Sequence, residues 1–464
     1  MGKQTQQIIV FAVALAMRLP FLFAGYGVEE DSWGHVLNAA LIFENGQYEI
    51  SRLPGHPLLE ALLLTLWKVH SPFIYNAFAA LAGAGATTIF FRLVYQHTPK
   101  LAFWWAIAFS AVPVFYIAST YTIDYAIALF FVLLSFEALQ EQKFERSGIW
   151  LAVATGFRIT SLGFILPFAY WIMTNKEAER SRALRLRNTM KVAVISTIVS
   201  VVFYIAPIVE YGAAFFNFHR PPYPDTLQII YKMLIGPWGL IGLAGLGIVV
   251  LILAFRSKIL RFSHKPFVFL FSIYLVYAIA YFRMPEKAAF WLPVVPFTIL
   301  FLARELPLSL SRILIISLIA SPFLMGINKA DPHTGSKHSP LAITFGSSDG
   351  QLFLDPIQGP VFNDFTKRQN KIAACQNIEH TMMLLREPTV VIAGWWYAMI
   401  EVNRRDGKWS NANVKTVYYA SPEELNAWKD KGYELRYLPD QQLVNDKKYN
   451  TNYTVTNATL LPIE

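Results

Sequence analysis

Long apolar segments dominate the first 326 residues of this chain of 464 residues. Segments long enough to cross a bilayer lie near residues 8–25, 73–94, 102–119, 123–139, 191–209, 235–255, 266–282, 288–303 and 311–326. Such segments fold as helices in lipid, because a helix satisfies all of its backbone hydrogen bonds internally. The pattern therefore predicts an all-α, multi-pass membrane domain over residues 1–326.

The composition agrees with a membrane protein. Hydrophobic residues make up 55% of the chain and charged residues 15%, whereas soluble domains carry about 25% charged residues. The net charge of +9 does not indicate a nucleic-acid partner, because much of the Lys and Arg lies in short loops that orient the chain in the bilayer. Cys375 is the only cysteine, so neither an intramolecular disulfide nor a cysteine metal cluster is possible, and we expect a buried thiol. The apolar N-terminus has no obvious cleavage site and is interpreted as an uncleaved first span.

The segment 147–174 decides the number of crossings. It carries Arg158 in its middle and is flanked by charged sequence at 141–146 and 176–187. If the segment forms two short helices that meet near Arg158, the basic loops fall on the same side as the N-terminus, as the positive-inside rule requires. This count predicts about eleven crossings of the plasma (inner) membrane, with the N-terminus in the cytoplasm and the C-terminus outside.

The predicted topology gathers charged residues on the extracytoplasmic face. The first outer loop, about residues 26–72, opens with the acidic residues 29–31, and Asp124, Arg158 and the loop 283–287 come to the same face. A carboxylate at the mouth of a membrane domain is costly to desolvate, so its presence there points to function.

After residue 327 the sequence becomes polar and rich in turn-forming residues. Residues 388–394, 414–419 and 433–438 read as strands, and Ser421 followed by Pro422 reads as the capped start of a helix. We therefore expect residues 327–464 to form a small soluble α/β domain outside the membrane.

The segment Asp31–Pro57 resembles the first extracytoplasmic loop of the GT-C glycosyltransferases, including their aminoarabinose and protein mannosyl branches. In that family an Asp after the first span is followed by an aromatic residue, an alanine-rich helix, a Gly about fifteen residues on and a basic element rich in proline. The corresponding residues here are Trp33, Ala39, Gly46 and the segment 52–57.

Three later segments are also similar to GT-C elements. Asp124 opens a span, as the second Asp of the family does, and Arg158 lies in a segment similar to the one where a basic residue faces the lipid phosphate. Residues 283–287 run into an aromatic-Leu-Pro-x-x-Pro span at 290–296. The resemblance implies a GT-C fold for the membrane domain.

The resemblance further implies an inverting enzyme that moves a single sugar from a polyprenyl-phosphate donor to an acceptor hydroxyl on the extracytoplasmic face. Asp31 would be the general base, because an attacking hydroxyl needs a nearby carboxylate to receive its proton. Asp124 and Glu30 complete the implied catalytic group. The family often has Glu after the first Asp, where this chain has Ser32, so Glu30 is the candidate supporting acid.

Other residues are implied to bind substrates. Four basic residues would hold the donor phosphate, since fixed cations stabilise a departing phosphate: Arg52, Arg158, Lys287 and Arg283. Three residues are candidates for acceptor or substrate contacts: His35, His56 and Trp33. The two histidines are too isolated in the sequence to indicate a metal site. No cofactor is implied, and no residue pattern in the sequence requires a divalent metal. The acceptor is a lipid, polysaccharide or protein.

Structural and functional alternatives remain open at this stage. Asp31 and Asp124 also suit the N-termini of helices, and Arg158 also suits an ion pair that only holds the fold. An oligosaccharyltransferase or polysaccharide ligase would share the architecture but transfer a whole glycan. A lipid or solute transporter would favour inverted repeats with matched broken helices, and the sequence shows one interrupted region without a matching partner.

Overall fold

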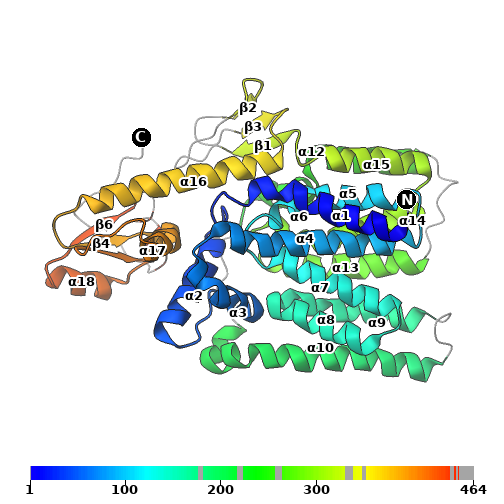
Figure 1. Ribbon diagram of the computed structural model, residues 1–464, viewed down its shortest axis with the longest axis horizontal. Coiled ribbons are helices and arrows are strands. Elements are labelled where there is room, and N and C mark those ends of the chain that lie inside the picture. The colour runs from blue at the N-terminus through cyan, green and yellow to red at the C-terminus, as the bar shows by residue number, and fades with distance from the viewer. Residues whose placement is uncertain are drawn as a thin grey trace.

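The computed structural model describes residues 2–175, 181–216, 223–255, 264–329, 338–346 and 352–438, together with 441, 444, 445 and 448. Long helices pack side by side in a bundle, with the N-terminus at one end (Figure 1). Helices α2 and α3 and the C-terminal strands lie at the other end (Figure 1).

Most of the bundle is built from twelve helices: α1 (Lys3–Arg18), α4 (Pro72–Tyr95), α5 (Ala102–Ala111), α6 (Pro113–Ala118), α7 (Tyr125–Gln140), α8 (Phe144–Phe157), α9 (Ile165–Thr174), α10 (Arg182–Tyr211), α12 (Gly236–Phe255), α13 (His264–Arg283), α14 (Val294–Glu305) and α15 (Leu308–Ala320). The short helix α11 (Thr226–Ile230) precedes α12.

Several of these helices suit a bilayer. Among the described residues, four stretches are long and apolar enough to cross it: Pro72–Tyr95, Arg182–Phe215, Thr226–Leu253 and His264–Arg283. Large apolar side chains are exposed along α10 and α13, where water would disfavour them and lipid would not: Ile198, Val202, Ile205, Leu275 and Ile279. The prediction of a multi-pass membrane protein is confirmed, and the number of about eleven crossings stays a prediction.

The segment 147–174 divides at Arg158. Helix α8 ends at Phe157, Arg158 is extended (φ −150°, ψ 110°), and a 3₁₀ turn over Ile159–Phe164 leads into α9. Two short helices therefore meet at the arginine, as the sequence predicts. Because Arg158 lies at the break, its side chain points away from the regular helix surface and reaches residues of other segments.

The first loop between spans contains α2 (Glu30–Asn45) and α3 (Pro57–Leu66). Glu30 and Asp31 occupy the first turn of α2, where negative charge is favoured by the helix dipole. Gly46 ends the helix in the left-handed conformation (φ 66°), which a residue with a Cβ adopts only at a cost. Pro57 begins α3 at a position where its missing N–H is harmless.

The C-terminal part contains two small sheets. Strands β1 (Gly326–Lys329), β3 (Leu352–Asp355) and β2 (Ile343–Phe345) form an antiparallel sheet in that order. Strands β5 (Val414–Val417), β4 (Thr389–Ile392) and β6 (Glu434–Tyr437) form a parallel sheet in that order. Three helices accompany them: α16 (Pro360–Met383), α17 (Tyr397–Arg405) and α18 (Pro422–Asp430). The three strands expected from the sequence are present, and Ser421 caps α18 through a capping box.

The C-terminal elements pack directly on the first loop. One hydrophobic cluster contains buried residues of α2, α3, α16 and α17, including Trp33, Leu59 and Cys375, so the lone thiol is buried as expected. Arg405 of α17 binds Glu44 of α2 with N–O distances of 2.8 and 3.1 Å. This shared core fixes the C-terminal part beside the acidic start of α2.

Candidate active site

A cluster of charged side chains from three distant segments surrounds Asp31. Arg52 donates from Nη1 to both Asp31 carboxylate oxygens, at 3.0 and 2.8 Å, and Lys287 Nζ lies 2.5 Å from Asp31 Oδ2. Lys287 also contacts Glu29 at 2.5 Å, and Arg52 Nη2 lies 3.5 Å from Glu286. We call these five residues the outer ion cluster. The cluster brings the predicted base together with two of the predicted phosphate-binding cations.

The outer ion cluster perturbs the acidity of its members. Burial opposes ionisation of Asp31, but Lys287 and Arg52 outweigh it and hold the pKa of this carboxyl well below its ordinary value. Burial likewise opposes the charge of Lys287, and Glu29 and Asp31 raise its pKa above the ordinary value. Asp31 and Lys287 are therefore both charged at neutral pH. Because the Asp31 side chain is 23% exposed and that of Arg52 38%, a ligand can reach the ion pair.

A second ion pair lies deeper in the protein. Arg158 Nη1 donates to Asp124 Oδ2 at 2.8 Å, and the two side chains are 12% and 1% exposed. The guanidinium also lies 4.0 Å from the ring centroid of Tyr125 and 5.0 Å from that of Phe290. Within the described part of the chain, Nε and Nη2 of Arg158 have no hydrogen-bond partner. The pair is thus held by packing while some donors stay available.

The two histidines connect the outer loop with this deeper pair. His56 Nδ1 lies 2.9 Å from the backbone oxygen of Phe157 and 3.7 Å from Asp124 Oδ2. His35 packs edge-on against His56, with ring centroids 4.9 Å apart, and its Nδ1 lies 2.8 Å from Ser51 Oγ. Burial, reinforced by His56, lowers the pKa of His35 to about 4. His35 is therefore neutral at physiological pH.

The fold also creates a potential metal-ligand group that the sequence does not suggest. His35, His56 and Asp124 offer ligand atoms that all lie within 4.8 Å of one another. Two imidazoles and a carboxylate are ligands that zinc and related ions accept. The guanidinium of Arg158 already occupies Asp124, however, and would repel a dication beside it. A cation would bind here only if Arg158 moved away from Asp124.

Glu60 supports the loop that carries Arg52, a role that the sequence analysis missed. It is 1% exposed and accepts hydrogen bonds from the hydroxyls of Tyr48 (2.5 Å) and Ser51 (2.8 Å). It also accepts from the backbone N–H groups of Ser51 (3.0 Å) and His56 (3.3 Å). The signal that could have found it is a single carboxylate inside the apolar run of α3.

The remaining candidates lie at the margin of this site. Glu30 points to the C-terminal part, where it is hydrogen-bonded to Tyr418, and burial raises its pKa. Trp33 is 3% exposed and donates from Nε1 to the Gly27 oxygen at 3.0 Å, which leaves little of its ring to a ligand. Arg283 donates to the backbone oxygen of Phe216 at 3.2 Å, outside the outer ion cluster.

Comparison with known proteins identifies the fold. No protein-family model and no curated protein matches the sequence. Among solved structures, the crystal structure of ArnT from Cupriavidus metallidurans bound to undecaprenyl phosphate matches with a TM-score of 0.58 at 13% identity, covering 97% of this chain and 96% of that chain. The apo structure of the same ArnT matches with a TM-score of 0.55 at 13% identity, covering 98% and 97%. This chain has the GT-C fold.

The GT-C fold extends over nearly the whole length of both proteins, so it includes the C-terminal part as well as the helical bundle. The GT-C fold that the sequence resemblance implies is thereby confirmed. In this chain, the segments around Asp31, Asp124, Arg158 and Lys287 converge on one end of the bundle, and the contacts described above join them in pairs.

Proposed function

We propose that this protein is a membrane glycosyltransferase that moves a single sugar from a polyprenyl-phosphate donor to an acceptor hydroxyl. The observation that carries the proposal is the placement of Asp31 between Arg52 and Lys287 on a GT-C fold. A carboxylate beside two reachable cations combines a proton acceptor with a phosphate site. The reaction would take place on the extracytoplasmic face of the inner membrane.

The donor phosphate would replace Asp31 as the partner of the two cations. Arg52 and Lys287 hold Asp31 in ion pairs that are partly exposed, so an incoming phosphate can compete for them. The free donors of Arg158 provide a further contact. A polyprenyl carrier is supported by the similar ArnT structure, which is bound to undecaprenyl phosphate. The tail of the carrier would lie against the apolar, exposed faces of the bundle.

This exchange would also make Asp31 a stronger base. While Asp31 is paired with two cations its pKa is low and it is a weak base. Once the phosphate takes the cations, Asp31 becomes more basic and accepts the proton of the acceptor hydroxyl. The hydroxyl oxygen then attacks the anomeric carbon, and the bond from that carbon to the phosphate oxygen breaks with its electron pair going to the phosphate. One displacement inverts the configuration of the sugar.

The acceptor would approach between α2 and the C-terminal sheet. Tyr418 is 39% exposed, is hydrogen-bonded to Glu30 and lies near Tyr397, with ring centroids 6.2 Å apart. These groups can hold an acceptor whose hydroxyl faces Asp31. We expect Tyr418→Ala to raise the KM for the acceptor several-fold while slow hydrolysis of the donor stays unchanged.

Arg52 and Lys287 supply the charge stabilisation in this scheme, so the proposal does not require a metal. We expect a chelator to leave the rate unchanged. A rate lost on chelation and restored by a divalent ion would instead assign a role to the group of His35, His56 and Asp124.

The test uses purified protein and a panel of radiolabelled polyprenyl-phosphate sugars. Transfer or hydrolysis of one donor is expected, and the variant Arg52→Gln/Lys287→Gln should lose it by at least 100-fold, about the effect of removing a stabilising donor from a transition state. The control is Lys68→Gln, an exposed cation of the same loop region that lies over Phe43. If no donor binds or reacts, the proposal fails and transport is the next hypothesis. Reaction only with glycans on a polyprenyl diphosphate would identify a glycan transferase.

A further inference from the structure

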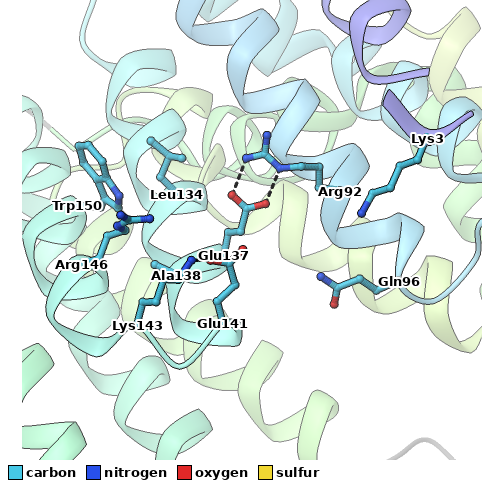
Figure 2. Close-up of a pocket in the computed structure, with 10 residues that line it drawn as sticks. All are labelled: Lys3, Arg92, Gln96, Leu134, Glu137, Ala138, Glu141, Lys143, Arg146 and Trp150. Carbon is cyan, nitrogen blue, oxygen red and sulfur yellow. Dashed lines mark hydrogen bonds and ion pairs between the residues drawn. The ribbon is translucent and has the colours of Figure 1, made fainter. Parts of the chain in front are cut away.

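A charged cavity lies at the end of the bundle that is opposite the candidate active site. Its volume is about 420 Å³, within the range of about 300–1,000 Å³ that small-ligand sites occupy. Its walls come from the N-terminus of α1, the C-terminal end of α4, and the turn between α7 and α8 (Figure 2). Figure 1 shows the N-terminus at the end of the bundle remote from α2 and α3. The cavity is therefore separate from the outer ion cluster.

Part of the charge around the cavity is internally neutralised. Arg92 donates from Nε and Nη2 to the two carboxylate oxygens of Glu137, both at 2.5 Å, and this pair points into the cavity (Figure 2). Lys143 Nζ lies 2.7 Å from Glu141 at the exposed rim. These two pairs leave no net charge, so they do not by themselves attract an ion.

Two further cations of the lining are not neutralised. Neither Lys3 nor Arg146 has a carboxylate partner in the part of the chain that the structure describes. Lys3 Nζ lies 5.3 Å from the ring centroid of Tyr95. Arg146 and Trp150 both line the cavity from α8 (Figure 2). The cavity thus has a surplus of two positive charges, which favours an anionic occupant.

The position of the cavity indicates what kind of anion it meets. It lies where the ends of membrane helices reach the polar surface, and its lining includes the apolar side chains of Leu134 and Trp150. Tryptophan is enriched at the level of lipid headgroups, where its ring is apolar and its Nε1–H finds a polar partner. Trp150 packs near Phe131, with centroids 5.6 Å apart, and its Nε1 has no acceptor among the described residues. Basic pockets between helices at this level suit lipid phosphates.

We propose that this cavity binds the headgroup of an anionic glycerophospholipid from the leaflet opposite the candidate active site. Arg146 holds the phosphodiester, and Trp150 contacts the glycerol region. Lys3, on the other side of the Arg92–Glu137 pair (Figure 2), supplies the second positive charge of the lining. The neutral pair of Arg92 and Glu137 forms the floor. A zwitterionic lipid brings its own ammonium group into the same space, and the two unpaired cations disfavour it.

The test is a titration of the detergent-purified full chain with phosphatidylglycerol or phosphatidylcholine, followed by native mass spectrometry. Phosphatidylglycerol should bind at least tenfold more tightly. The double variant Lys3→Ala/Arg146→Ala should weaken its binding by up to about 25-fold, because each basic residue near an anionic lipid contributes about fivefold. The matched control is Lys100→Ala/Arg312→Ala, which removes two exposed cations outside the cavity, one from the turn after α4 and one from the first half of α15.

Three results would overturn the proposal. The first is equal affinity for the two lipids, and the second is an equal loss of phosphatidylglycerol binding in the control variant. The third is displacement of phosphatidylglycerol by millimolar inorganic phosphate alone, which would identify a site for the free ion. A second measurement does not depend on the stability of the double variant. The fluorescence of Trp150 is obtained as the difference between the wild type and Trp150→Phe. Brominated phosphatidylglycerol should quench this difference, and brominated phosphatidylcholine should not.

Discussion

Asp31→Asn should separate the two roles that we assign to the outer ion cluster. Asp31 binds Arg52 and Lys287. In the proposed mechanism it competes with the donor phosphate for these two cations, and it also accepts the proton of the acceptor. Asparagine keeps the size of the side chain but loses both the charge and the basicity. We therefore expect slower transfer together with tighter binding of the donor, a combination that simple damage to the site does not produce.

The structure sets the size of both effects. A positioned general base contributes roughly 10²- to 10⁴-fold to a rate, so turnover should fall by this factor. The ion pairs to Asp31 are partly exposed, with Arg52 38% and Lys287 18% accessible, so each is discounted to about 1 kcal/mol at most. Releasing both cations should then tighten donor binding by up to about thirtyfold. Lys287 stays in place through its second partner, Glu29.

The assay combines equilibrium binding of a radiolabelled donor with single-turnover transfer. The matched control is Asp225→Asn, which changes an exposed carboxylate that caps α11 through the backbone N–H of Gln228. Unchanged turnover in Asp31→Asn would refute the role of Asp31 as the base. Weaker donor binding would show that Asp31 positions the cations and does not compete with the phosphate.

Three further predictions concern the parts that hold the site. Glu60→Gln should lower the free energy of unfolding by about 1–3 kcal/mol and reduce turnover, because a buried acceptor of four hydrogen bonds is replaced by a group with its own donors. Thermal unfolding in detergent measures the loss of stability, and an unchanged unfolding midpoint would contradict the prediction. Arg158→Met or Asp124→Asn alone should destabilise the protein by about 3–5 kcal/mol, because each substitution leaves a buried charge unpaired. The double variant should recover part of this loss, and additive losses would argue against a coupled pair. The pKa of His35 is lowered to about 4, so the unfolded chain takes up this proton first as the pH falls. The free energy of unfolding should therefore decline between pH 6.5 and 4, by about 3 kcal/mol at most. His35→Gln should flatten this part of the profile of stability against pH.

Local sequence predicted the elements that carry the site. The break at Arg158 follows from an arginine that an apolar helix in lipid does not tolerate on its surface. The strands at Thr389–Ile392 and Val414–Val417 follow from short apolar runs with β-branched residues between turn signals. In each case the deciding residues lie within about one helical turn or one strand of each other, so that the pattern alone contains the information.

The partners of these residues were predicted less completely. The sequence indicates Lys287 as a candidate phosphate ligand. It does not reveal that Lys287 binds Asp31 and Glu29, which lie more than 250 residues away in the chain. It treats His35 and His56 as isolated, although α2 and the start of α3 bring their rings into contact. Spacing along the chain does not reveal such contacts, since they depend on how separate segments are packed.

The sequence by itself determined that this chain forms a helical membrane protein with a charged first loop, because hydrocarbon admits only apolar, internally hydrogen-bonded segments. It also determined which residues stand at the ends of those segments. Only the tertiary structure decided that Asp31 is neutralised by Arg52 and Lys287, that Glu60 holds the loop and that Tyr418 meets Glu30. The physical reason is that helix packing sets the distances between charges, and those distances determine which carboxylate is paired with which cation.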